Sequence, residues 1–108
     1  MASEKQYEEK IKAHLKALPR TWFFKVWGGG FQKAGIPDII ALVNGHFVAI
    51  EVKAEKGKPS PLQLYNIDRI NAAGGYGIIT YPNDWDALRA ELDTLAGVTQ
   101  WTRNTPKE

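Results

Sequence analysis

The stretch that decides the fold is PDIIALVNGHFVAIEVK, residues 37–53. It contains two runs rich in apolar and β-branched residues, Pro37–Val43 and His46–Lys53, with Asn44-Gly45 between them. An Asn-Gly pair between strand-like runs is a strong hairpin signal, because both turn positions need positive φ and these residues adopt it readily. The stretch therefore predicts two antiparallel strands joined by a two-residue turn.

The turn also sets the register of the hairpin. With Val43 opposite His46, Asp38 lies directly opposite Glu51, and opposed side chains share a face with Cβ atoms about 4.5–5.5 Å apart. Lys53 follows Glu51 by two positions, so strand alternation puts it on that face too. We therefore expect two carboxylates and an amine to converge at one end of the hairpin.

The remaining segments extend this hairpin into an α/β fold. Helices are predicted over residues 3–18, 60–73 and 83–95, and two further strands over 21–27 and 76–81. The order is α-β-β-β-α-β-α, which indicates a mixed sheet with flanking helices. The step from the hairpin through the second helix to the last strand is a β-α-β crossover, so that strand pair is expected to be parallel.

Length and composition limit the classes of protein that fit. The chain has 108 residues, which is enough for one domain. We place that domain over residues 1–95, with a C-terminal tail over 96–108. Hydrophobic residues make up 44% and charged residues 24%, as in a soluble globular protein. No run reaches the about 18–20 apolar residues of a membrane span, and the polar start is no signal peptide. We therefore expect a cytoplasmic protein.

The residue types present also restrict the chemistry. There is no cysteine and there are two histidines, which excludes disulfides and thiolate metal sites and leaves too few ligands for a multi-histidine zinc site. Any metal would rest mainly on oxygen ligands. The net charge of +2 permits a nucleic-acid partner without arguing strongly for one.

The opposed carboxylates of Asp38 and Glu51 need a counter-charge. Two carboxylates at that distance repel each other, and a cation between them removes the repulsion. Mg²⁺ suits such a place, since it takes oxygen ligands, often from one or two protein carboxylates. The alternative is a cross-strand ion pair in which Lys53 neutralises either acid. The independent turn signal that adds Asp38 favours the metal site.

Gln63 has two interpretations. At 100° per residue it shares a helix face with Ile67 and Ile70, so it points inward with the apolar stripe. It also follows Ser60 by three positions, which is the spacing of a capping box. An inward role at a site and a capping role do not exclude each other.

Glu8 is a weaker candidate on the first helix. The apolar stripe of that helix is centred between Tyr7 and Leu15, and Glu8 lies about 60° from its centre. Glu4 also falls on the stripe, but at the frayed start of the helix. If the helix contributes an acid to the site, Glu8 is the better choice. Helix geometry alone favours an ordinary boundary glutamate.

Three motifs together resemble a known family. They are Gly35-Ile36-Pro37-Asp38, Glu51-Val52-Lys53 and Ser60-Pro61-Leu62-Gln63. In this order they are similar to the virus-type replication-repair nuclease (VRR-NUC) domain of the PD-(D/E)xK nuclease superfamily. The resemblance covers about residues 4–95 and implies the restriction-endonuclease-like core of that superfamily.

The resemblance implies roles for individual residues. Asp38 and Glu51 would bind Mg²⁺, which Mn²⁺ would replace, with the Val52 carbonyl as a further ligand. Lys53 would position or help to deprotonate the attacking water and offset charge on the scissile phosphate. The remaining catalytic positions that it implies are Gln63, which would orient groups at the site, and Glu8, which would match the acid of the family's first helix.

Basic residues near the expected site are candidates for binding the phosphates of the DNA backbone. They occupy strand or loop positions where phosphates would pass, and they are Lys25, Lys33, Lys56 and Lys58. Each of them has an alternative interpretation as a solubilising surface charge.

The resemblance implies a Mg²⁺-dependent endonuclease acting on DNA, with no small-molecule cofactor. Free-standing members of the family are homodimers that cut branched substrates such as four-way (Holliday) junctions, in phages or mobile elements. One rival function is a nicking, flap-cutting or nonspecific nuclease on the same core. The other is a noncatalytic nucleic-acid-binding module.

Overall fold

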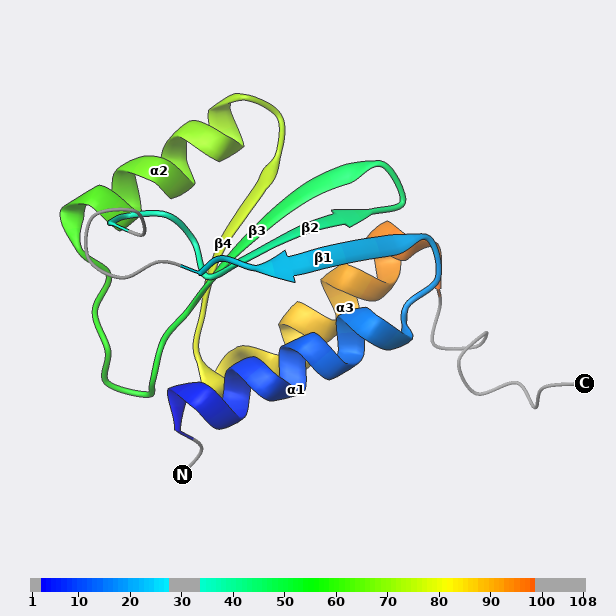
Figure 1. Ribbon diagram of the computed structural model, residues 1–108, viewed down its shortest axis with the longest axis horizontal. Helices are drawn as coiled ribbons and strands as arrows, with labels where there is room; N and C mark the ends of the chain where they lie inside the picture. The colour runs from blue at the N-terminus through cyan, green and yellow to red at the C-terminus, as the bar shows by residue number, and fades with distance from the viewer. Residues whose placement is uncertain (1–2, 28–33, 99–108) are drawn as a thin grey trace, which may run out of the picture.

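A four-stranded sheet between two helical layers forms the centre of the structure, a computed structural model that describes residues 3–27 and 34–98 (Figure 1). In chain order the elements are α1 (Glu4–Ala17), β1 (Thr21–Lys25), β2 (Ile39–Val43), β3 (His46–Val52), α2 (Pro61–Ala72), β4 (Tyr76–Thr80), a 3₁₀ turn (Pro82–Asp84) and α3 (Trp85–Ala96). The predicted α/β order is confirmed, and the 3₁₀ turn is an addition to it.

The sheet has the strand order β1-β2-β3-β4. Val43 faces His46 and Ile39 faces Ile50 across the β2–β3 hairpin, which is the predicted register. The turn residues Asn44 and Gly45 have φ of 50° and 84°, as a two-residue hairpin turn requires. β1 pairs antiparallel with β2, and β4 pairs parallel with β3, so the crossover prediction is also confirmed.

The hydrophobic core lies between the sheet and the pair of helices α1 and α3. From the sheet it takes alternate residues of β2 and β3, and from the helices one apolar stripe each. The fully buried large side chains are Tyr7, Ile11, Leu15, Ile39, Ile50, Leu92, Val43, Val48 and Val52, together with the polar Thr80. α2 lies on the opposite face, where it packs against β3 and β4 (Figure 1).

Several element bounds differ from the predicted ones because of proline. Pro37 has no N–H to donate, and β2 begins two residues after it, at Ile39. The backbone pairing with the β1 segment nevertheless reaches Asp38, whose carbonyl accepts from the Val26 N–H at 2.8 Å. Pro82 starts the 3₁₀ turn, so α3 begins at Trp85 rather than at residue 83.

The tail that we placed over residues 96–108 begins inside the fold. Ala96 is buried at the end of α3, and Val98 packs against the core. The helix stops at Gly97, whose φ of 79° is in the left-handed region that favours glycine. Residues 99–108 lie outside the described residues.

Polar contacts also join the layers. The Tyr7 hydroxyl of α1 hydrogen-bonds the Thr80 hydroxyl at the end of β4. Burial raises the pKa of the Tyr7 phenol above its ordinary value, although the bond to Thr80 partly opposes this. The Nε2 atom of His14 in α1 lies 2.8 Å from the Oδ1 atom of Asp93 in α3. No helix in the described part of the chain is long and apolar enough to cross a membrane.

Candidate active site

The two predicted carboxylates meet at one end of the β2–β3 hairpin. Asp38 precedes β2 by one residue and Glu51 is the penultimate residue of β3. Extending the observed register by one pair puts them opposite each other, on the sheet face that carries α2. Their exposed fractions are 5% and 3%. Two buried carboxylates so placed are uncommon, because burial of an ionised group costs several kcal/mol unless it is compensated.

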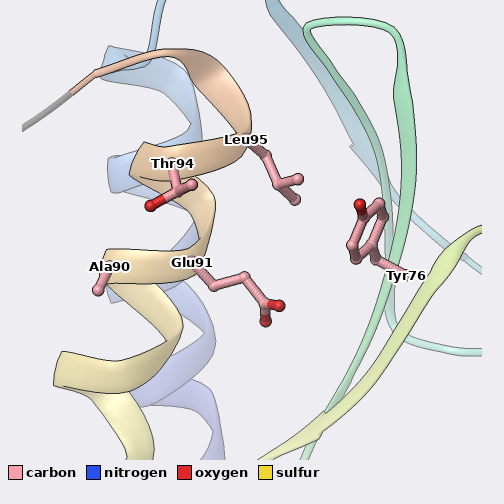
Figure 2. A pocket seen from close by; sticks show the side chains of 5 residues that line it. All are labelled: Tyr76, Ala90, Glu91, Thr94 and Leu95. Atoms are coloured by element: carbon pink, nitrogen blue, oxygen red, sulfur yellow. The ribbon is translucent and has the colours of Figure 1, made fainter.

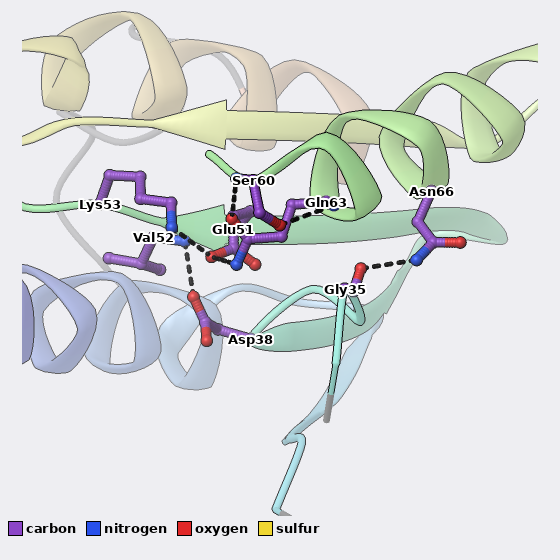
Figure 3. A network of polar contacts seen from close by, with 8 residues as sticks. All are labelled: Gly35, Asp38, Glu51, Val52, Lys53, Ser60, Gln63 and Asn66. Carbon is purple, nitrogen blue, oxygen red and sulfur yellow. Dashed lines mark hydrogen bonds and ion pairs between the residues drawn. The ribbon is translucent and has the colours of Figure 1, made fainter. Parts of the chain in front are cut away.

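The Asp38 carboxylate is held by a backbone N–H group of the neighbouring strand, β3. The Val52 N–H donates to its Oδ2 at 2.8 Å (Figure 3). Its own carbonyl accepts from Val26, as described above. The side chain and the main chain of Asp38 are thus both fixed by strands on either side, which gives the carboxylate a defined position without help from a ligand.

Glu51 receives two contacts at one oxygen. The Gln63 Nε2 donates to its Oε2 at 2.9 Å, and the Lys53 Nζ lies 3.3 Å from the same atom. Figure 3 shows Gln63 reaching this oxygen from α2 and Lys53 reaching it from the chain just after β3. The prediction that Lys53 shares the face of Glu51 is confirmed.

Gln63 makes both the capping contact and the inward contact that its two interpretations predict. Its Oε1 accepts from the Ser60 N–H at 2.8 Å, and the Ser60 hydroxyl accepts from the Gln63 N–H at 3.2 Å. This is the reciprocal capping box that begins α2. Because the amide oxygen serves the cap, the amide nitrogen is turned toward Glu51.

A second contact, which the sequence analysis does not predict, joins α2 to the loop before Asp38. The Asn66 Nδ2 donates to the Gly35 carbonyl at 2.7 Å (Figure 3). Gly35 has φ of 74°, and a Cβ on it would overlap the side chain of Leu62. Only glycine fits this position, so α2 sits directly on the loop that positions Asp38. No signal in the sequence identifies Asn66 as this partner.

Helix geometry favours a boundary position for Glu8, but the side chain is buried, and it contacts two lysines rather than the carboxylate pair. Its Oε1 lies 2.7 Å from the Lys25 Nζ, and its Oε2 lies 3.8 Å from the Lys12 Nζ. Lys25 also stands over the ring of Trp27, with 5.7 Å to the ring centroid. Lys25, which we predicted to contact DNA, is therefore engaged by a carboxylate. A catalytic role for Glu8 stays a prediction.

The other predicted DNA contacts are only partly described. Lys56 and Lys58 are exposed in the loop between β3 and α2, close in sequence to Lys53. Lys33 lies outside the described residues.

The donor set matches the ligand preferences of a hard cation. Asp38 and Glu51 supply carboxylate oxygens, and Mg²⁺ is commonly held by one or two carboxylates with water and substrate phosphate. In the described residues no group of three or more His, Cys, Asp or Glu side chains could hold a metal ion. Participation of the Val52 carbonyl stays a prediction.

A hollow of about 440 Å³ elsewhere in the fold offers less chemistry. It lies between α3 and the start of β4, and Figure 2 shows Glu91 and Leu95 pointing toward the side of Tyr76. Among the described residues that line it, Glu91 is the one carboxylate. It provides no pair of charged groups such as the one at the hairpin end.

Comparison with known proteins identifies one informative relative. A protein named "Putative nuclease p44", from Acyrthosiphon pisum secondary endosymbiont phage 1, is 31% identical over 87 residues. The match covers 75% of this chain and 89% of the phage protein. No family model matches the chain.

Proposed function

This chain belongs to the family of that phage protein, a nuclease family, and we propose that it is a Mg²⁺-dependent endonuclease that hydrolyses the phosphodiester bonds of DNA. The observation that carries the proposal is the meeting of Asp38, Glu51 and Lys53 at one sheet end, with Gln63 bonded to Glu51. The same residues support membership of the VRR-NUC branch of the PD-(D/E)xK superfamily. The proposed site of action is the cytoplasm of a bacterial or phage-infected cell.

In this proposal Asp38 and Glu51 hold the metal ion, with the Val52 carbonyl beside them. When bound, Mg²⁺ supplies a nucleophile at neutral pH and neutralises charge that develops on the phosphate. Mn²⁺ replaces it, because it also accepts oxygen ligands. The buried positions of the two carboxylates strengthen their interaction with any cation, since the local dielectric constant is low.

The remaining side chains orient the reacting groups. The Lys53 ammonium, 3.3 Å from the Glu51 Oε2, is a point charge on a flexible type of side chain, and in this proposal it faces the attacking water or the scissile phosphate. Gln63 fixes one oxygen of Glu51 through its amide nitrogen. The carboxylate therefore keeps a single orientation before substrate arrives, and this preorganisation lowers the barrier to the reaction.

The substrate that we propose is branched DNA, cut by a homodimer. A chain of this size with one candidate site cuts two strands symmetrically only if a twofold axis relates two sites. Lys56 and Lys58, exposed in the loop that follows Lys53, are the proposed phosphate contacts. Each phosphate contact of this kind makes binding more sensitive to salt.

The test is cleavage of a labelled four-way junction beside a matched linear duplex, with Mg²⁺ and with EDTA. Paired symmetric cuts in the junction alone support a dimeric junction-resolving enzyme. Cutting of both substrates supports the nuclease and rejects the junction specificity, which leaves a nicking, flap-cutting or nonspecific enzyme.

Folded protein that cuts nothing with Mg²⁺ or Mn²⁺ rejects the nuclease. The chain would then be a noncatalytic nucleic-acid-binding module. The matched variant is Lys53→Met, which keeps the length of the side chain and removes its charge. The proposal predicts that this variant binds DNA and does not cut it. Metal-dependent cutting by the purified variant contradicts the role given to Lys53.

A further inference from the structure

The two faces of the sheet are covered unequally by helices. α1 and α3 pack on one face, whereas α2 packs on the other face against β3 and β4 (Figure 1). Neighbouring strands lie about 4.8 Å apart, and a helix with its side chains is about 10–12 Å wide, so one helix covers about two strands. β1 and β2 are therefore left without a helix on the face that carries α2.

Most of the large apolar side chains that are exposed in the described residues belong to this side of the sheet. Four of them come from the strands, and we call them the open face: Trp22, Phe24, Leu42 and Phe47. Three come from the helix, and we call them the α2 ridge: Leu62, Leu64 and Tyr65. Each of the seven is between 44% and 65% exposed. Because Trp22 lies opposite Leu42 and Leu42 lies opposite Phe47, the open face is continuous across three strands.

The open face carries no charge. Lys25 of β1 points to the other side of the sheet, where its Nζ lies 2.7 Å from the Glu8 Oε1. The guanidinium of Arg20, just before β1, donates to the Ala96 carbonyl at the end of α3. Proteins neutralise DNA phosphates with lysine and arginine, and the described strands β1 and β2 present neither on the open face. An apolar protein surface therefore fits the open face better than DNA does.

The exposed apolar area is of the size that a stable dimer needs. Aromatic side chains bury about 150–250 Å² each and leucine somewhat less, so the open face and the α2 ridge together expose about 700 Å² of apolar surface. The largest apolar patch of a typical monomer is about 300–600 Å². Burial of both surfaces in two copies would remove about 1,400 Å² from solvent, within the range of about 1,200–2,000 Å² for specific interfaces.

We propose that two copies of this chain dimerise by laying the α2 ridge of each copy on the open face of the other. The helix of the second copy then covers β1 and β2, so each sheet has two helices on either face. The contact is isologous, because the same two surfaces meet twice about a twofold axis. The proposal rests on the homodimer of the proposed function and assigns the surface that forms it.

This arrangement places both candidate active sites at one end of the dimer. The two α2 helices lie side by side between the two sheets, and they change places only about a twofold axis that runs between them and along them. The first turns of both helices, each with a Gln63 bonded to Glu51, then lie at the same end. One layer of helix separates the two carboxylate pairs, and one branched DNA molecule reaches both.

The experiment is sedimentation equilibrium of wild type, Trp22→Glu and Tyr65→Lys, without DNA or metal. Both side chains are largely exposed in a single chain, so both variants should fold as wild type does, which circular dichroism checks. Wild type should be a dimer. In each variant the dimer dissociation constant should rise by about 100-fold or more, because the twofold axis repeats the loss of an aromatic anchor.

The matched control is Trp27→Glu, the same substitution just after β1. The Trp27 ring lies beside the Lys25 Nζ, 5.7 Å from its centroid, on the side of the sheet that carries α1. This variant should remain as dimeric as wild type.

A mixture of the two variants tests whether the contact is reciprocal. In a mixed dimer the substituted open face of one chain meets the substituted α2 ridge of the other, so the new glutamate lies beside the new lysine. The second contact of the mixed dimer has the wild-type residues on both sides. Equimolar Trp22→Glu and Tyr65→Lys should therefore dimerise together, although neither does so alone.

Four results overturn the proposal: a monomeric wild type, unchanged dimers in both variants, a mixture of the variants that stays monomeric, and a Trp22→Glu variant that loses DNA affinity while it keeps the dimer. The last result would assign the open face to nucleic acid. Cleavage is a separate readout. Wild type that dimerises through these surfaces and cuts no DNA rejects the nuclease alone, whereas wild type that cuts DNA while both variants stay dimeric rejects this interface alone.

Discussion

Asp38 provides the sharpest test of the site, because its structural and chemical roles can be separated. Its Oδ2 accepts the buried Val52 N–H at 2.8 Å. Asp38→Asn keeps an oxygen for that bond and removes the charge. Asp38→Ala leaves the N–H without this acceptor, and an unsatisfied buried donor costs about 1–3 kcal/mol. A domain is stable by about 5–15 kcal/mol, so both variants should remain folded.

The two substitutions should therefore differ in stability and agree in activity. Asp38→Asn removes the repulsion between Asp38 and Glu51, so its free energy of unfolding should equal or exceed that of wild type. Asp38→Ala should fall below it by about 1–3 kcal/mol. Both should lose more than about 100-fold in Mg²⁺-dependent cleavage, since removal of even an outer-shell partner of a metal costs about 10- to 100-fold.

Urea denaturation and cleavage of the same preparations test this reasoning. Comparable cleavage by Asp38→Asn and wild type would refute the role of Asp38 as a metal ligand. Equal stability of Asp38→Asn and Asp38→Ala would refute the contribution assigned to the Val52 hydrogen bond. The two refutations are independent, because one concerns rate and the other the free energy of unfolding.

Further substitutions test three other contacts of the fold by urea denaturation. Gly35→Ala should destabilise the fold by about 1–3 kcal/mol, because its φ is positive and its Cβ would meet Leu62; wild-type stability would contradict this packing. Lys25→Met should cost about 1.5–3 kcal/mol by removing the ion pair with buried Glu8, and adding Glu8→Gln should recover part of the loss. Burial raises the pKa of Tyr7, so the fold favours the neutral phenol. This contribution is complete below about pH 10 and is lost as the pH rises toward the raised value. Wild type should therefore lose stability above pH 10 more steeply than Tyr7→Phe does, and parallel curves would exclude the effect.

Local signals explain why much of this fold was predictable. The Asn44-Gly45 turn fixes the register through backbone conformation, and the register alone then places Asp38 opposite Glu51. The period of α1 likewise predicts the apolar stripe between Tyr7 and Leu15, and both of these residues are buried. In both cases the information lies within a few residues along the chain, where steric preferences of the backbone act directly.

The parts that the sequence did not predict depend on contacts between distant segments. The bond from Asn66 to Gly35 and the ion pair from Lys25 to Glu8 join elements far apart in the chain. Neither residue type indicates its partner, because asparagine and lysine are ordinary surface residues. The exposure of the side chains that β1 and β2 present on the face of α2 is not predicted either, because it depends on where α2 packs rather than on any strand pattern.

Gln63 shows how local folding and site geometry are coupled in this protein. One end of its amide completes the cap that begins α2, and the other end holds Glu51. The cap fixes the rotation of the amide, so the direction of the donor to Glu51 follows from the way the helix starts. The same helix contacts the loop before Asp38 through Asn66. α2 therefore contacts Glu51 directly and the loop before Asp38 through Gly35, and a change at its first turn acts on the site through the fold itself.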